Sequence, residues 1–154
     1  MRSGLYCAVV FGMLACATAA QNNELRLQIS IPREIAAQAA RHAAGDASAP
    51  TPVLMLHGLE FGANEGFKIE VLGESQPGAA PVLLGVTALV GHPQRSPQAP
   101  LRKINLPVPL NDAAAPLLAN HSEVTIILRF MNIAPERPPV KIDSVSFASS
   151  ATKE

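Results

Sequence analysis

The four histidines of the chain come first, because an imidazole can bind a metal ion or move a proton near neutral pH. They are His42, His57, His92 and His121. A metal site on a single element needs ligands that share a face, two residues apart on a strand or four apart on a helix. No two of these histidines have such a spacing. We therefore expect no metal site and no metal cofactor in this chain.

A second candidate is the pair His57–Gly58, which directly follows the apolar run 53–56. Many α/β-hydrolases present an oxyanion-hole amide after a strand that ends in this way. These enzymes also carry their nucleophile in a Gly-x-Ser-x-Gly turn, and the chain has no such motif. Around Ser75, Pro77 stands where the second glycine belongs. The sequence thus excludes a hydrolase of this class, and we interpret His57 as a histidine at a strand edge or in a turn.

The other nucleophiles and acids form no catalytic pattern. The serines in predicted loops have no base near them in the sequence, and the aspartates are isolated, without the spacing of a calcium-binding loop. These residues are Ser75, Ser96, Ser122, Asp46, Asp112 and Asp143. Lys68 and Glu70 share a face of one predicted strand, where we interpret them as a solvated ion pair. We expect no catalytic residue, no bound cofactor and no enzymatic activity.

Residues 1–20 have the pattern of a signal peptide. Arg2 gives a positive start, residues 5–14 form an apolar run, and the small residues 17–19 suit a cleavage site. The apolar run is too short to span a bilayer. We therefore expect export to the periplasm or the cell exterior, with a mature chain that begins near Gln21.

Both cysteines, Cys7 and Cys16, lie inside this segment. Met13 stands where a lipoprotein signal has leucine, which argues against lipidation of Cys16. The mature chain would contain no thiol, hence no disulfide and no thiolate ligand. Twelve basic residues balance twelve acidic ones, without a basic block. The composition therefore predicts neither a nucleic-acid partner nor a membrane partner after signal removal.

Short apolar patterns with turn residues between them predict strands over most of the chain. Residues 21–52 would hold a first strand at 24–31, a helix at 33–44 and a connector rich in proline and alanine. Residues 148–154 read as a frayed tail. Further strands are predicted at 53–61, 67–72, 82–90, 101–108, 123–131 and 140–147. About seven strands with one short helical connector indicate an all-β fold, an antiparallel β-sandwich or a small barrel, with its domain at 53–147.

Several segments resemble, in order and spacing, one known domain. The run 53–61 is VLMLHGLEF, residues 68–71 are Lys-Ile-Glu-Val, and 84–92 is LGVTALVGH. Together they resemble the C-terminal domain of polyphenol oxidases (tyrosinases), whose signature is Lys-Phe-Asp-Val. Residues 124–128 and 140–145 are similar to its last two strands. The positions for which the resemblance implies a structural role are Gly58, Lys68, Glu70, Gly85 and His92.

The resemblance implies a partner rather than an activity. In that family the domain packs over a di-copper site and restrains access to it. The chain has four histidines, fewer than the full set of ligands for two copper ions. We therefore expect a non-catalytic accessory domain that shields or assists a separate copper-containing phenol oxidase, with the loop 91–100 able to enter a cleft. The alternative is a stand-alone binding or structural module without an oxidase partner.

Overall fold

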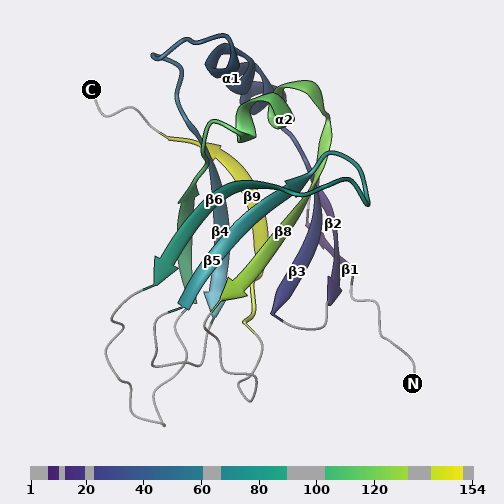
Figure 1. Cartoon of the computed structure of the whole chain (residues 1–154). Helices are drawn as coiled ribbons and strands as arrows, with labels where there is room; N and C mark the ends of the chain where they lie inside the picture. The colour runs from purple at the N-terminus through teal and green to yellow at the C-terminus, as the bar shows by residue number, and fades with distance from the viewer. Residues whose placement is uncertain are drawn as a thin grey trace, which may run out of the picture.

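The computed structural model describes residues 7–10, 13–19, 23–60, 67–89, 103–131 and 140–150, the first two ranges by their backbone alone. Within these ranges the chain has nine strands and two helices. The strands form two antiparallel sheets that face each other and do not close into a barrel (Figure 1). The prediction of an all-β sandwich is thus confirmed, and the small barrel is not formed.

The larger sheet contains six strands in the order β1-β2-β3-β8-β5-β6. In β3, β5 and β8, apolar side chains alternate with polar ones, so that one face of each strand is buried against the opposite sheet. The bounds are β1 Cys7–Val10, β2 Met13–Ala19, β3 Glu24–Ser30, β8 Glu123–Met131, β5 Phe67–Glu74 and β6 Val82–Leu89.

The smaller sheet contains β7 (Lys103–Pro109), β4 (Pro52–Glu60) and β9 (Ser144–Ser149), in that order. The two prolines of β7 suit a sheet edge because proline has no N–H to donate. β9 extends beyond the predicted strand, and Ala148 pairs with Val53. The predicted fraying is therefore wrong for the described residues 148–149, and 151–154 lie outside the described residues.

Between the two sheets lies one continuous apolar core. Its fully buried side chains come from both sheets, so each sheet buries its apolar face against the other. They include Leu54, Leu56 and Leu59 of β4, Ile69 and Val71 of β5, and Val124, Ile126 and Leu128 of β8.

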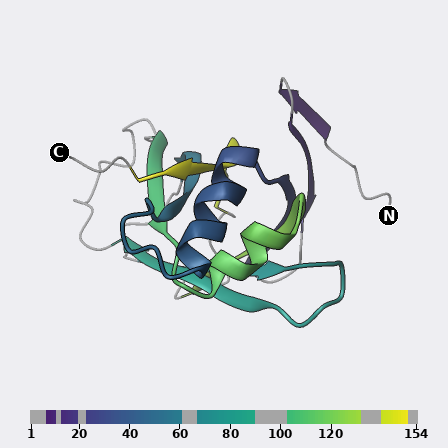
Figure 2. The ribbon, with the colours of Figure 1, turned by 90° about the horizontal axis from the view of Figure 1, so that it is seen from above.

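Two helices close one end of the sandwich, as Figure 2 shows from above. The helix α1 (Arg33–Ala43) agrees with the helix predicted at 33–44, and the second helix, α2, spans Ala114–Asn120. Ile35 and Ala39 of α1 are buried, and α1 packs against α2. At the opposite end of the sandwich β4, β6 and β8 finish, and β5, β7 and β9 begin (Figure 1).

The segment that we expect to be a signal peptide contributes β1 and β2. β2 pairs with β3, with Thr18 opposite Arg26, so that it covers the edge of β3 within the same sheet. β1 pairs only with β2 among the described strands. Signal-peptide removal stays a prediction, and it would leave β3 as the edge of the larger sheet.

Candidate binding face

The outer face of the larger sheet carries most of the charged side chains of the described strands. The registers place residues of β3, β8 and β5 in rows across it, such as Glu24 beside Arg129 and Arg129 beside Glu70. All these residues have the strand parity opposite to that of the buried core residues. The face is therefore a surface of charged side chains whose spacing is set by the pairing of the strands.

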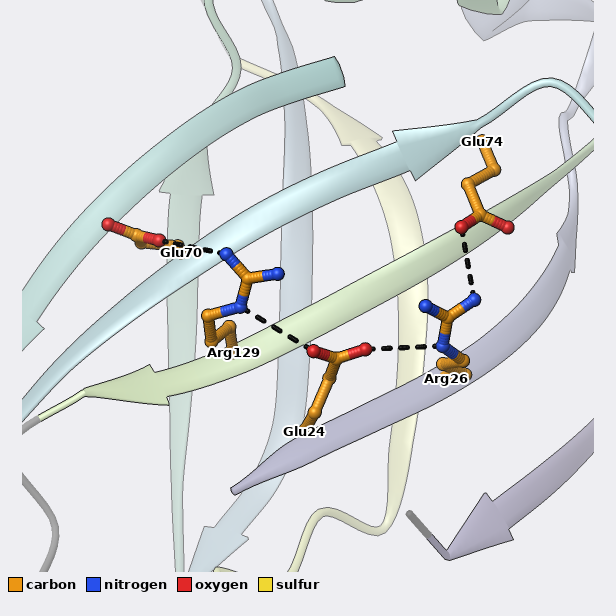
Figure 3. A network of polar contacts seen from close by, with 5 residues as sticks. All are labelled: Glu24, Arg26, Glu70, Glu74 and Arg129. Carbon is orange, nitrogen blue, oxygen red and sulfur yellow. Dashed lines mark hydrogen bonds and ion pairs between the residues drawn. The ribbon is translucent and has the colours of Figure 1, made fainter. Parts of the chain in front are cut away.

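On this face, side chains of alternating sign form a chain of ion pairs (Figure 3). Lys68 Nζ lies 2.9 Å from Glu70 Oε1, and Glu70 Oε2 lies 3.8 Å from Arg129 Nη1. The nitrogen Nε of Arg129 is 3.5 Å from Glu24 Oε2. The other oxygen of Glu24 accepts a hydrogen bond of 3.2 Å from Nε of Arg26. Because each charge has an opposite neighbour, the charges on this face are largely compensated.

Glu74 ends this chain and differs from its other members. Its Oε1 accepts a hydrogen bond of 3.0 Å from Nη1 of Arg26. Only 3% of Glu74 is exposed, and its Oε2 is buried without a hydrogen-bond partner among the described residues. In Figure 3 this second oxygen points away from Arg26. A buried carboxylate with one unpaired oxygen depends strongly on the single cation that it contacts.

Apolar side chains continue across the same face. Ile127 and Leu72 lie side by side in the register and are buried, although they have the outward parity. Beyond them on β6, Leu83 is opposite Leu72 and Val86 is opposite Glu70. Leu83 is 43% exposed and Val86 is 42% exposed. This face thus combines exposed apolar area with a charged border, as protein interfaces do.

A shallow polar groove of about 380 Å³ lies where this face meets the helical end. Its lining includes Gln28, Ser75, His121 and Glu123. Gln28 Nε2 donates a hydrogen bond of 2.7 Å to Glu123 Oε2, so two of these groups are already paired with each other. The groove offers hydrogen-bonding groups at the border of the apolar area.

The glycines that the family resemblance singles out each have a backbone reason to be glycine. Gly58 has a φ of +62° at an irregularity of β4, and its N–H donates a hydrogen bond of 3.1 Å to Asn105 Oδ1. Gly85 lies where β6 approaches β7 closely. A Cβ on Gly85 would lie 2.6 Å from the carbonyl oxygen of Pro109. These two predicted residues position strands and carry no reactive group.

Lys68 and Glu70, the other described residues of the resemblance, face outward together, as the sequence predicts. Glu70 also contacts Arg129 and so belongs to the ion-pair chain. His92 and the loop 91–100 lie outside the described residues. The structure therefore brings Lys68 and Glu70 together but places both away from Gly58, which lies in the other sheet.

The described histidines contact three different elements. His57 belongs to the middle strand of the smaller sheet, so its placement at an edge or in a turn is wrong. Its Nε2 lies 2.8 Å from Ser146 Oγ on β9. His42 Nε2 on α1 lies 3.1 Å from Asp112 Oδ1, and His121 Nδ1 lies 2.9 Å from the carbonyl oxygen of Leu117. Among the described residues no three His, Cys, Asp or Glu side chains form a possible metal site.

The aspartates that looked isolated in the sequence have partners. Asp46 accepts hydrogen bonds from the Ser48 hydroxyl and from the guanidinium of Arg41 after the end of α1. These bonds lower the pKa of Asp46 to about 2, with the Ser48 hydroxyl as the largest cause. Asp143 accepts hydrogen bonds from Lys103 Nζ and raises the pKa of that lysine. These are local contacts that stabilise a turn and a strand end.

The sequence does not predict the ion-pair chain as a whole, because three of its contacts join residues on different strands. Arg26 and Glu74 are separated by 48 residues and belong to strands that each pair with β8. The signal that could have found them is the outward parity of charged residues in three predicted strands. The alternation of apolar and polar residues in β3, β5 and β8 predicts that these charged side chains face outward. It does not predict the order of the strands in the sheet.

Comparison with known proteins identifies no relative: no protein-family model and no curated protein matches the chain. None of the helices in the described part of the chain has the length and apolar content needed to cross a membrane.

Proposed function

We propose that the chain is a non-catalytic, exported β-sandwich that binds another protein through the outer face of its larger sheet. The observation that carries this proposal is the exposure of Leu83 and Val86 of β6. When a partner removes such apolar side chains from water, the free energy of the complex falls by about 25 cal/mol per Å² of apolar surface buried. The neighbouring charges are paired with one another and border the contact.

The partner class in this proposal comes from the sequence resemblance. A copper-containing phenol oxidase that lacks its own C-terminal domain would present a surface around its copper site that such a module covers. A module bound there would restrain substrate access by steric exclusion. The paired charges of Glu70 and Arg129 would limit wrong partners, because an unpaired charge opposite them costs free energy.

The test measures whether the chain binds and inhibits a phenol oxidase that is encoded next to the gene for this chain. The purified chain should co-purify with that oxidase and lower its rate of phenol oxidation. Leu83→Ser with Val86→Ser should weaken binding by at least about tenfold, since central apolar residues dominate such contacts. Val53→Ser, on the outer face of the smaller sheet, is the matched control and should bind as the unchanged chain does.

Two results contradict the proposal. If the unchanged chain neither binds nor inhibits the oxidase, the oxidase partner is wrong, and the alternative of a stand-alone module takes its place. If binding occurs but the β6 variant binds as well as the Val53→Ser control, the contact lies on another face.

A further inference from the structure

We infer that two copies of the mature chain associate through the edge of β3, forming one continuous sheet across a two-fold axis. The inference goes beyond the proposed function, and it rests on removal of residues 1–20 during export. Removal of this segment takes away β1 and β2 and exposes the side of β3 that β2 covers. The partner in this contact is the β3 strand of a second copy.

On that side β3 has the backbone N–H and C=O groups that do not bond to β8. Ile31 N donates to Ser122 O at 2.8 Å, and Phe130 N donates to Asn23 O at 2.7 Å. Hydrogen-bonded and non-hydrogen-bonded pairs alternate along an antiparallel ladder. The odd-numbered residues of β3 therefore bond to β8, and the even-numbered residues direct their N–H and C=O groups toward the opposite side. The structure itself places an antiparallel strand there, with Arg26 paired to Thr18 of β2.

The seven residues of β3 can pair with themselves along their full length. When Leu27 lies opposite Leu27 of the second copy, Arg26 lies opposite Gln28 and Glu24 lies opposite Ser30. The even-numbered pairs then exchange both of their backbone hydrogen bonds. No like charges face each other directly in this register. In the register that places Arg26 opposite Arg26 of the second copy, fewer residues pair and two positive charges face each other.

This register also keeps the alternation of the sheet. Leu27 and Ile29 are buried in the core, and their partners in the second copy, Leu27 and Leu25, face the same side of the joined sheet. β6 is at the opposite edge of the larger sheet from β3. The dimer therefore leaves Leu83 and Val86 free in both copies, so that failure of this inference and failure of the proposed function are distinguishable.

The first experiment measures the mass of the exported protein in solution. Intact-mass analysis should show loss of about the first 20 residues, and sedimentation velocity should show a dimer. Gln28→Pro removes one N–H from the free edge without removing a bond to β8, and it should weaken the dimer by at least about tenfold. The control Gln28→Ala removes the side chain, keeps the N–H and should remain dimeric. Circular dichroism checks that both variants are folded.

A second experiment fixes the register and does not depend on a proline. The mature chain has no cysteine, so a single new thiol can form a disulfide only between copies. Leu27→Cys places two thiols across the axis with Cα atoms about 4.5 Å apart, within the range that a disulfide spans. In Leu25→Cys the two Cα atoms are displaced by about 13 Å along the strands. Mild oxidation should link the Leu27→Cys chains and leave the Leu25→Cys chains unlinked.

The inference is overturned by a mature chain that is monomeric at all concentrations, or by an exported chain that retains residues 1–20. A dimer that Gln28→Pro leaves unchanged places the contact elsewhere and also overturns it. So does equal cross-linking of Leu25→Cys and Leu27→Cys, because the register is then wrong.

Discussion

Arg26 and Glu74 are joined across a strand that lies between them. Nη1 of Arg26 on β3 donates a 3.0 Å hydrogen bond to Oε1 of Glu74 on β5, and β8 separates the two strands. The two partners have different surroundings. The side chain of Glu74 is 4% exposed, whereas that of Arg26 is 45% exposed and also contacts Glu24. Only the carboxylate depends on this pair for its charge to be compensated.

The first prediction follows from this asymmetry. Arg26→Met leaves the buried carboxylate of Glu74 without a cation and should lower the free energy of unfolding by about 2 kcal/mol. Glu74→Leu removes the buried charge, and Arg26 remains solvated beside Glu24. That variant should lie within about 1 kcal/mol of the unchanged chain. Urea denaturation at neutral pH measures both values.

The double variant Arg26→Met with Glu74→Leu is the control for this prediction. It should regain most of the stability that Arg26→Met loses, because no buried charge is left unpaired. Equal losses in the two single variants would show that the carboxylate has another partner in the folded chain.

The second prediction concerns the close approach of β6 to β7. Gly85→Ala should lower the free energy of unfolding by about 2 kcal/mol, because its Cβ meets the backbone carbonyl of Pro109. Gly73→Ala is the matched control, since its Cβ meets side-chain atoms of Leu84 and Leu117, the nearest of them methyl groups, and no backbone atom is among its three nearest contacts. Thermal unfolding compares the two, and an effect of Gly73→Ala as large as that of Gly85→Ala would contradict the assignment.

The third prediction is a pH dependence at Asp46. The pKa of its carboxyl group is lowered from 3.8 to about 2, first by the Ser48 hydroxyl and then by Arg41. A lowered pKa means that the contribution of Asp46 to stability is present above pH 3.8 and is lost as the pH falls through 2. NMR titration should give this low pKa, and Ser48→Ala should raise it. An unchanged pKa in Ser48→Ala would show that Arg41 is the dominant cause.

The fourth prediction concerns copper. The described histidines point to separate partners, His42 to Asp112, His57 to Ser146 and His121 to the end of α2. We expect added copper with a catechol to give no oxidation above that of copper alone, measured as quinone absorbance. Turnover that depends on the chain would contradict our expectation of a non-catalytic module.

The strands of this fold could be predicted well because apolar residues alternate with polar ones along them, and the apolar residues are the ones that face the core. β8 has the predicted bounds, Glu123–Met131, and β3 has an unbroken alternation of apolar and polar residues. His57 was misplaced because a strand pattern does not state which strand is central. That position depends on β7 and β9 pairing with both sides of β4, which are contacts between distant segments.

The candidate face could be predicted only in part. Lys68 and Glu70 are two residues apart on one strand, so their contact follows from the sequence alone. Arg26 and Glu74 meet only because β3 and β5 both pair with β8, and no local pattern determines that order. The exposure of Leu83 was equally hidden. An apolar residue in a strand is normally assigned to the core, and here it faces outward beside Leu72.

The two ends of the sandwich have different tolerance for change. α1 and α2 close one end, while at the other end β4, β6 and β8 finish and β5, β7 and β9 begin. A peptide inserted after β4, β6 or β8 would therefore enter at the end away from the two helices. Once residues 1–20 are removed, as we expect, the remaining chain has no cysteine and needs no disulfide, so it could be produced in a reducing cytosol. Both properties make this domain a practical frame for displaying grafted peptide loops.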